Sequence, residues 1–331
     1  MTRERFLEWL GETEQRAKGP LEAALSAARE GDASQCAAEA RAAAAAYLEG
    51  YLAAVGGEGT GGGCVRELLE AAIGHDRYFE RVRAEAELLE EVEEGGGAGA
   101  DCEGIVEAMK DVRMLSWARA GHAMGFLAYL DKGDPRLREF VVHSTTAERA
   151  KSIFAHGALY SFSRCVEEGL LTGAPLGVEG LLDPRRLTDY VIFGIAERAS
   201  HGGEMVANSQ RKGRVDEALA EDYQPSVRLF FRREELEGLA GYEDDGVHVL
   251  LVRDEVGLDL LAYAVFPNEA ALGASLGAVE EGERRERLRE RCLVASAECC
   301  GKPMVYVKGT NELVAKRAVG ERQAADGVEG E

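Results

Sequence analysis

The stretch that decides the fold of the second half of this chain is FVVHSTTAERAKSIFAHGAL, residues 140–159. It opens with Phe140–Val142, a β-branched and aromatic run that is typical of a buried strand. Ser and Thr residues follow, which are favoured at helix N-termini, and apolar residues then recur at helical spacing. Gly157 ends this pattern, because glycine readily adopts the left-handed conformation found just past helix ends. The stretch therefore predicts a strand, a helix and a tight turn in direct succession.

Downstream, short apolar runs recur and predict further strands, with a charged helix at Glu280–Cys292. The predicted strands are Tyr190–Phe193, Val227–Phe231 and Val247–Val252, with closing strands at Met304–Val307 and Leu313–Val314. Strands outnumber helices and do not alternate strictly with them, which favours an α+β fold of short, mainly antiparallel strands. We predict that this domain spans residues 136–318 and that a disordered polar tail, residues 319–331, follows it.

Upstream, residues 1–135 predict an all-α helical bundle. Apolar residues repeat at helical spacing, and the run AAEARAAAAAYLEGYLAA has high helix propensity. Asp32 with Gln35 three residues later is a capping pattern at a helix start. Glycine-rich breaks join the helices, as in a bundle of antiparallel helices. The boundary lies near Pro135, because Gly and Pro together in Asp131–Glu139 mark a change of structure.

Composition narrows the classes of protein that this chain can belong to. Its 331 residues include 46% hydrophobic residues, enough for ordinary cores, and its formal net charge is −21. An acidic field repels phosphate backbones and anionic lipids, so nucleic-acid binding is not expected. No segment approaches the roughly 20 apolar residues that span a bilayer. Seven scattered cysteines do not indicate a secreted disulfide framework. These features predict a cytoplasmic protein that does not enter membranes.

The helical half has a generic resemblance to a known family. The segment EGDASQCAAEARAAAAAYLEGYL resembles the first long helices of HEPN-type bundles. Nuclease members of that family carry an Arg, four to six residues, then a His on one helix. Here Arg119 is too close to His122 and Arg113 is too far from it. We therefore interpret this half as a partner-binding or dimerising module, with a possible homodimer, rather than as a nuclease.

The stretch at residues 140–159 carries a sharper resemblance. It is similar to the first NAD-binding strand of ADP-ribosyltransferases of the poly-ADP-ribose-polymerase and diphtheria-toxin type. That strand ends in a His followed by hydroxyl residues, a helix and a glycine turn. The resemblance implies that NAD is the substrate and that His143, Ser144 and Thr145 bind it. Physically, such a site needs a polar side chain for the ribose hydroxyls and an exposed backbone edge for the carboxamide.

A second part of the resemblance lies near the C-terminus. In PMVYVKGTNELVAKRAV, Glu312 follows Asn311 and precedes an apolar pair. Transferases of this family carry their catalytic glutamate in a similar Asn-Glu setting before a strand. The resemblance implies that Glu312 stabilises the positive charge that develops as nicotinamide leaves. The order of His143 before Glu312 also matches the family.

The middle of the domain matches less closely. The family has an aromatic ring that stacks on nicotinamide, and Tyr190 or Phe193 would occupy that place. Ser209 and Arg211 lie in a stretch of small and hydroxyl residues similar to the loop that follows this aromatic. Arg211 and Arg228 are candidates for the pyrophosphate, because a planar guanidinium matches phosphate geometry.

The sequence thus supports two functions of different classes. The first is NAD-dependent ADP-ribosyl transfer, or NAD glycohydrolysis, by residues 136–318 with an unidentified macromolecular acceptor. The alternative is a non-enzymatic interaction or dimerisation protein, in which His143 ends a strand and Ser144 or Thr145 caps the following helix. On that alternative the aromatics are core residues and Glu312 lies in a surface turn. We predict no metal site.

The charge predicts negligible binding to nucleic acids at physiological salt. Duplex DNA and single-stranded RNA are titrated with the protein over a range of salt concentrations. We expect no saturable binding, because a net charge of −21 opposes a polyanion. Micromolar affinity that falls steeply with salt would contradict this and reveal a basic patch formed in three dimensions.

Overall fold

A computed structural model of the chain describes residues 3–57, 63–94, 101–124, 134–171, 184–196, 224–244, 249–301 and 303–328. The chain folds as two compact units, of which residues 1–129 with 177–185 and 245–247 form the first, called here the helical unit. The remaining residues form the second, called here the sheet unit. The predicted α+β class is confirmed, with helices at the N-terminus and a mostly antiparallel sheet after them. Within the described ranges, none of the helices combines the length and apolarity that a bilayer crossing requires.

The helical unit is built around alanine-rich packing. Its helices are α1 Arg3–Glu30, α2 Ala33–Ala54, α3 Val65–His75, the 3₁₀ helix η1 Arg77–Val82, α4 Arg83–Glu94 and α5 Cys102–Ala123. The turn before α2 forms as predicted, since Gly31 has φ +75° and the Asp32 carboxylate accepts a hydrogen bond from the Gln35 N–H at 2.9 Å. Three alanines of α2, Ala40, Ala43 and Ala44, are fully buried, which lets neighbouring helices approach closely.

Two buried arginines of α5 hold the helical unit together. Arg113 donates to the Tyr47 hydroxyl at 3.1 Å and to Glu14 at 3.4 Å, which joins α5 to α2 and α1. Arg119 forms an ion pair with Asp76, between α3 and η1. A buried guanidinium needs such partners, because removing a charge from water is costly. Both arginines therefore serve helix packing.

In the described residues of the sheet unit, seven strands form the main sheet in the order β5-β6-β3-β1-β4-β8-β9. Their bounds are β1 Phe140–Thr145, β3 Tyr190–Ile195, β4 Val227–Arg232, β5 Tyr242–Asp244, β6 Val249–Arg253, β8 Leu261–Phe266 and β9 Cys292–Val294. Neighbouring strands are antiparallel except for the parallel pair β8–β9. A two-stranded ladder, β2 Ala158–Tyr160 with β7 Glu255–Gly257, lies apart from this sheet.

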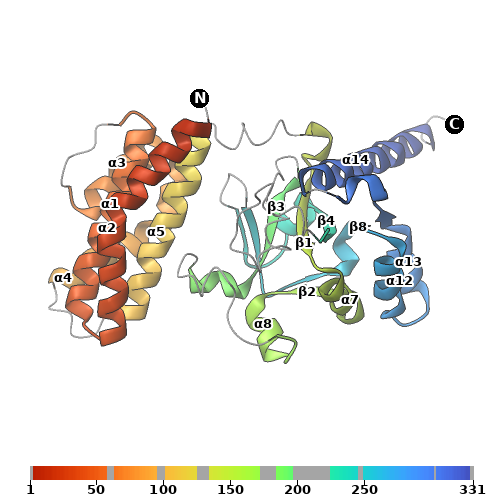
Figure 1. Ribbon diagram of the computed structural model, residues 1–331, viewed down its shortest axis with the longest axis horizontal. Coiled ribbons are helices and arrows are strands. Elements are labelled where there is room, and N and C mark those ends of the chain that lie inside the picture. The colour runs from red at the N-terminus through yellow and green to blue at the C-terminus, as the bar shows by residue number, and fades with distance from the viewer. Residues whose placement is uncertain are drawn as a thin grey trace. The chain divides into compact units, whose positions relative to one another are not determined.

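Helices cover the two faces of the main sheet (Figure 1). On the first, the α7 face, Val141 packs with α7 Ala147–His156, α12 Glu269–Gly277 and α13 Glu283–Glu290. On the second, the α14 face, Phe140 and Val142 pack with α14 Pro303–Val328. The shorter helices are η2 Pro135–Leu137, α8 Phe162–Glu167, η3 Arg185–Asp189, α11 Arg233–Glu237, η7 Leu258–Leu260 and η8 Ala297–Cys299.

The end of the chain differs from the prediction. The expected closing strands Met304–Val307 and Leu313–Val314 are both part of α14, which continues to Val328, so residues 319–328 are helical rather than a tail. The buried residues of this segment recur at spacings that place them on one side of a helix. They are Tyr306, Val307, Thr310, Val314, Ala315 and Ala318. Two short apolar runs had suggested strands because each was considered without the residues between them.

Arg228 anchors α14 to the sheet. Its side chain is fully buried on β4, and its Nη1 donates to Thr310 Oγ1 at 2.5 Å, to Asn311 Oδ1 at 2.8 Å and to the Val307 carbonyl at 3.2 Å. Tyr306 adds a hydrogen bond from its hydroxyl to the Ser226 carbonyl at 2.5 Å. The interpretation of Arg228 as a pyrophosphate ligand is therefore wrong, since α14 covers its guanidinium.

This anchor yields a prediction about two adjacent residues of α14. Asn311→Ala removes an acceptor of a buried charge, so we expect a loss of about 1–3 kcal/mol in the free energy of unfolding. Glu312→Gln, the matched control, changes an exposed carboxylate and should stay within about 0.5 kcal/mol of wild type. Urea unfolding measures both variants, and equal losses would contradict the anchoring role of Arg228.

Candidate functional site

The centre of the candidate site is a break in the main sheet beside β1. This strand pairs with β4 along its whole length, from Phe140 to Thr145. With β3 it pairs at only two positions, Val141 with Ile195 and Val142 with Gly194. Beyond Val142, the edge of β1 that faces β3 is outside the ladder. Such an edge presents backbone N–H and C=O groups that a ligand can use.

His143 occupies this break. Its Nδ1 lies 2.9 Å from the Ile192 carbonyl oxygen, and its ring meets the Phe193 ring at a 66° interplanar angle with centroids 6.0 Å apart. A carbonyl only accepts, so Nδ1 carries the proton and Nε2 is left as an acceptor. None of the described residues bonds Nε2. A rigid, neutral acceptor is therefore held at the end of the β1–β3 ladder.

The charge state of His143 follows from its surroundings. Burial lowers the pKa of the imidazole, because the charged form loses its water. The Ile192 carbonyl partly offsets this, and the cationic Arg149 lowers the pKa further. His143 is consequently neutral at physiological pH. This state suits an acceptor of a hydroxyl hydrogen bond rather than an anion ligand.

The three residues expected at the ribose do not share one face. Thr146, and not Ser144 or Thr145, caps α7, since its Oγ1 accepts a hydrogen bond from the Arg149 N–H at 3.2 Å. Ser144 and Thr145 are buried as the last residues of β1. Successive strand residues point to opposite faces. Thr145 thus shares the α7 face with His143, whereas Ser144 lies on the α14 face opposite Arg228.

Arg149 is a component of the site that the sequence interpretation missed. It lies in the first turn of α7 and influences both His143 and Cys165 of α8. Burial raises the pKa of the Cys165 thiol, and Arg149 opposes that rise. The exposed Arg149 guanidinium thus brings positive charge to the Thr145 end of β1. In the sequence, Arg149 lies in the first turn of a helix that directly follows a strand, and this position could have indicated that it belongs to the site.

Glu312 is not part of this site. It lies on α14, with 45% of its side chain exposed, and accepts from Arg136 Nη2 at 2.6 Å and pairs with Lys316 Nζ at 3.4 Å. Hydrogen bonding to Arg136 lowers the pKa of its carboxyl. Because α14 covers the face opposite to His143, the structure does not bring the two predicted catalytic residues together. The sheet lies between them.

The expected aromatic positions are also separated. Phe193 is fully buried and packs edge-on against Phe231 with centroids 5.4 Å apart, so it is a core residue. Tyr190 lies on the α14 face of β3, and its hydroxyl donates to Glu243 Oε1 at 2.6 Å. Phe193 also contacts the His143 ring, but as a buried core residue, whereas Tyr190 lies on the opposite face of β3. Ser209 and Arg211 lie outside the described residues.

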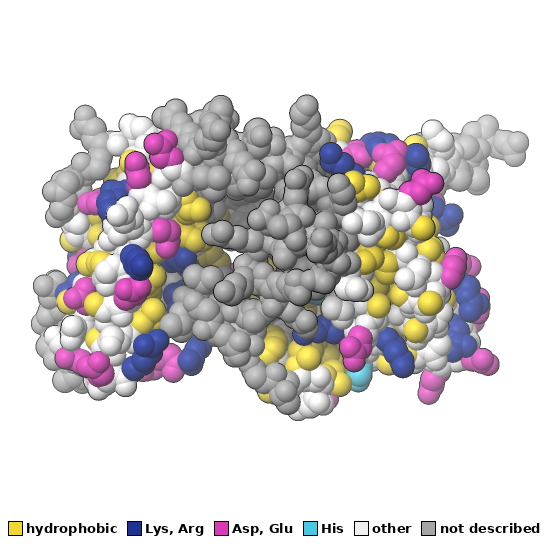
Figure 2. Space-filling model, in the orientation of Figure 1, with side chains coloured by type: hydrophobic (Ala, Val, Ile, Leu, Met, Phe, Trp, Pro, Cys, Tyr) yellow, Lys and Arg dark blue, Asp and Glu magenta, His cyan; other side chains and the backbone are white. Residues whose placement is uncertain are grey.

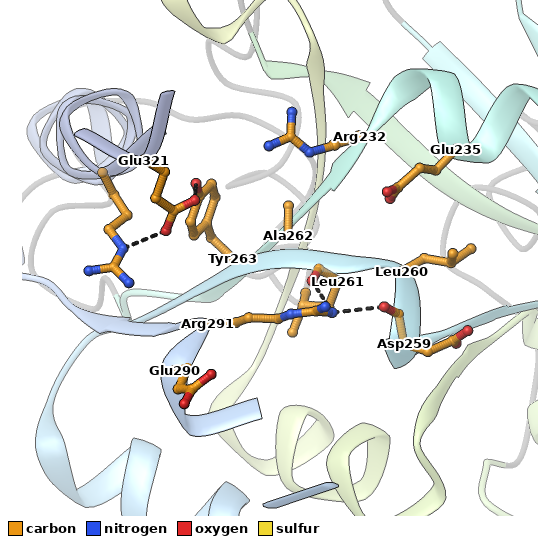
Figure 3. A pocket seen from close by; sticks show the side chains of 11 residues that line it. Arg232, Glu235, Asp259, Leu260, Leu261, Ala262, Tyr263, Glu290, Arg291 and Glu321 are labelled. Carbon is orange, nitrogen blue, oxygen red and sulfur yellow. Dashed lines mark hydrogen bonds and ion pairs between the residues drawn. The ribbon is translucent and has the colours of Figure 1, made fainter. Parts of the chain in front are cut away.

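A second feature, absent from the sequence interpretation, is a cavity of about 270 Å³ lined by residues of α14, β8 and the end of α13 (Figure 3). Arg232, Tyr263 and Arg291 contribute to its lining, together with carboxylates and a short aliphatic stretch. It lies at the Phe140 end of β1, since Phe140 pairs with Arg232. The cavity and the His143 site are therefore at opposite ends of the β1–β4 pair.

On the face shown in Figure 2, basic and acidic side chains of the described residues are interspersed.

Comparison with protein-family models, with curated proteins and with solved structures gave no match to this chain.

The neutral His143 predicts a particular pH dependence. Its folded pKa is lowered from an ordinary value near 6.5, so the unfolded chain binds more protons as pH falls below that value. We therefore expect wild type to lose more unfolding free energy than His143→Gln between pH of about 7.5 and about 5.5, on either side of the ordinary histidine value. Urea unfolding at both pH values measures this. Equal losses would show that the pKa of His143 is not lowered.

Proposed function

We propose that the sheet unit binds NAD at the Thr145 end of β1 and there catalyses ADP-ribosyl transfer to a macromolecule or NAD glycohydrolysis. The observation that carries the proposal is the break in the β1–β3 ladder, in which the Ile192 carbonyl fixes His143. It provides the two elements that a nicotinamide riboside site needs, an acceptor for a hydroxyl and an unpaired backbone edge.

His143 would orient the ribose. Its Nε2 can accept a hydrogen bond from a ribose hydroxyl, because Nδ1–H is committed to the Ile192 carbonyl. The lowered pKa of the imidazole keeps that lone pair available at neutral pH. The unpaired edge of β1 beyond Val142 would bond the carboxamide, which carries both a donor and an acceptor, as a backbone peptide does.

The pyrophosphate would lie toward α7. Arg149 contributes a guanidinium near His143, and the N-terminus of α7 directs backbone N–H groups toward the same end of β1. Local positive charge is required because the chain as a whole carries −21. NAD extended from the break in the ladder toward Arg149 would meet complementary groups at its carboxamide, its nicotinamide ribose and its pyrophosphate.

In the reaction, the bond between ribose C1′ and the nicotinamide nitrogen breaks, and its electron pair leaves with nicotinamide. Water or an acceptor nucleophile then bonds C1′ and loses a proton. His143 would hold the ribose while positive charge develops at C1′. Glu312 has no role in this proposal, because it pairs with Arg136 on the α14 face.

The proposal predicts binding and turnover that depend on His143 and Arg149. NAD should raise the melting temperature of wild type by mass action, and free nicotinamide should accumulate. His143→Ala and Arg149→Gln should each weaken NAD binding by roughly tenfold, as expected for loss of one charge-assisted or oriented hydrogen bond. Calorimetry with NAD and chromatography of released nicotinamide measure these effects.

Two further variants sharpen the test. Arg289→Gln alters an exposed arginine of α13 that pairs with Glu286, and it should behave as wild type. Glu312→Gln should also leave NAD turnover unchanged, whereas a fall of about two orders of magnitude would restore Glu312 as the stabilising carboxylate. If wild type shows neither an NAD-dependent thermal shift nor nicotinamide release, the proposal fails and the interaction-module interpretation stands.

A further inference from the structure

Two cysteines of the helical unit meet across two helices. Cys36 lies near the start of α2, and Cys102 is the first residue of α5. The Sγ atom of Cys36 donates a hydrogen bond to the backbone carbonyl of Cys102 at 3.8 Å. The Cys102 thiol is also close enough to hydrogen-bond with the Cys36 thiol. Two thiols that are 66 positions apart in the sequence are therefore neighbours in the fold.

The packing of α2 against α5 holds these two thiols in place. The two helices lie side by side (Figure 1). They run in the same direction, because the hydrogen bond between Arg113 and Tyr47 lies farther along both helices than the contact between Cys36 and Cys102. Cys36 is part of the buried core of the unit, and Cys102 packs against that core. Facing side chains on a fixed framework are what a disulfide requires.

The two thiols differ in their access to solvent. Cys36 is fully buried, whereas Cys102 is half-buried. Burial raises the pKa of the Cys36 thiol to about 12, and the neighbouring Cys102 and Asp32 also raise it. Because the thiolate is the reactive form, Cys36 is not the thiol that reacts first with a dissolved reagent. The pair thus combines an accessible thiol with a buried one whose nearest reaction partner is Cys102.

The other neighbouring cysteines of this chain are placed differently. Cys299 and Cys300 both donate to the Ser296 carbonyl, at 3.1 Å and 3.4 Å, but they are adjacent in the sequence. A disulfide between adjacent residues closes a small ring, and departures from ordinary disulfide geometry are strained. Among the seven cysteines, all of which lie in the described ranges, Cys36 and Cys102 are consequently the pair suited to join separate elements.

From this geometry we propose that Cys36 and Cys102 are an oxidation site, which a small disulfide such as glutathione disulfide converts to a disulfide between α2 and α5. The Cys102 thiolate attacks one sulfur of glutathione disulfide, whose S–S bond breaks and releases one glutathione. Cys36 then loses its proton to water and attacks Sγ of Cys102, which expels the second glutathione. The two protein thiols lose two electrons and two protons, and the two glutathione thiols gain them.

The disulfide would stabilise the helical unit. It closes a loop that contains α3, η1 and α4, and a cross-link over a long loop removes much conformational freedom from the unfolded chain. In the reduced protein, the same helix ends are joined by the thiol–carbonyl contact. This inference concerns the helical unit and does not depend on NAD binding at the His143 site.

The experiment compares the reduced full chain with the same protein after incubation with glutathione disulfide. Mass spectrometry of peptides from a digest under non-reducing conditions should identify a peptide pair linked through Cys36 and Cys102. The thermal transition, followed by circular dichroism of the helices, should rise by at least about 5 °C on oxidation. Dithiothreitol should reverse both changes.

Three variants separate the roles of the two thiols. Cys36→Ala should accumulate a lasting mixed disulfide with glutathione at Cys102, because the buried partner that resolves it is gone. Cys102→Ser should leave Cys36 unmodified, because burial protects it, and neither variant should gain thermal stability on oxidation. Each tests the inference if the other fails to fold. Cys64→Ser, the control, removes an exposed thiol of the same unit and should keep both the link and the stabilisation.

Four results would each overturn the inference. The first is the absence of a linked peptide, and the second is a mixed disulfide at Cys102 of wild type that does not close. The third is a link that forms only when urea has unfolded the chain. The fourth is a linked protein whose thermal transition does not rise.

Discussion

The burial of Arg228 is the constraint on which the architecture of the sheet unit depends. A buried guanidinium needs acceptors, and Thr310, Asn311 and the Val307 carbonyl of α14 accept from its Nη1. This fixes α14 on one face of the sheet. Glu312, the next residue, is consequently held on that face, and Glu321, farther along, becomes a wall of the cavity beside Tyr263. One buried charge thus determines where both of these carboxylates lie.

The two-residue period of β1 has the complementary effect. Val141, His143 and Thr145 point to one face, while Phe140, Val142 and Ser144 point to the other. The strand pairs fully with β4 but leaves β3 after Val142, and His143 fills the break through the Ile192 carbonyl. The His143 side chain thus takes the place of backbone pairing between β1 and β3. This placement makes His143 the best-supported part of the candidate site.

Local patterns in the sequence predicted much of the fold. The site was harder to predict, because it depends on how residues far apart in the sequence are placed in space. The strand, helix and glycine turn at residues 140–159 and the Asp32 cap depend on neighbouring residues, and they form as expected. The α14 segment was wrongly predicted to form two strands, because two short apolar runs were considered without the helical spacing of the apolar residues across the whole segment. Proximity of His143 and Glu312 could not be derived, because it depends on which face α14 covers. That face is set by Arg228, whose burial no local pattern indicates.

The proposed NAD site places local positive charge within a strongly acidic protein. A net charge of −21 disfavours any anionic ligand at long range, so binding depends on cations that lie close to it. Arg149 is such a cation, because it lies in the first turn of the capped helix α7, beside His143. The surrounding acidic field then favours NAD over simple polyanions, because the positively charged nicotinamide ring reduces the net negative charge of NAD.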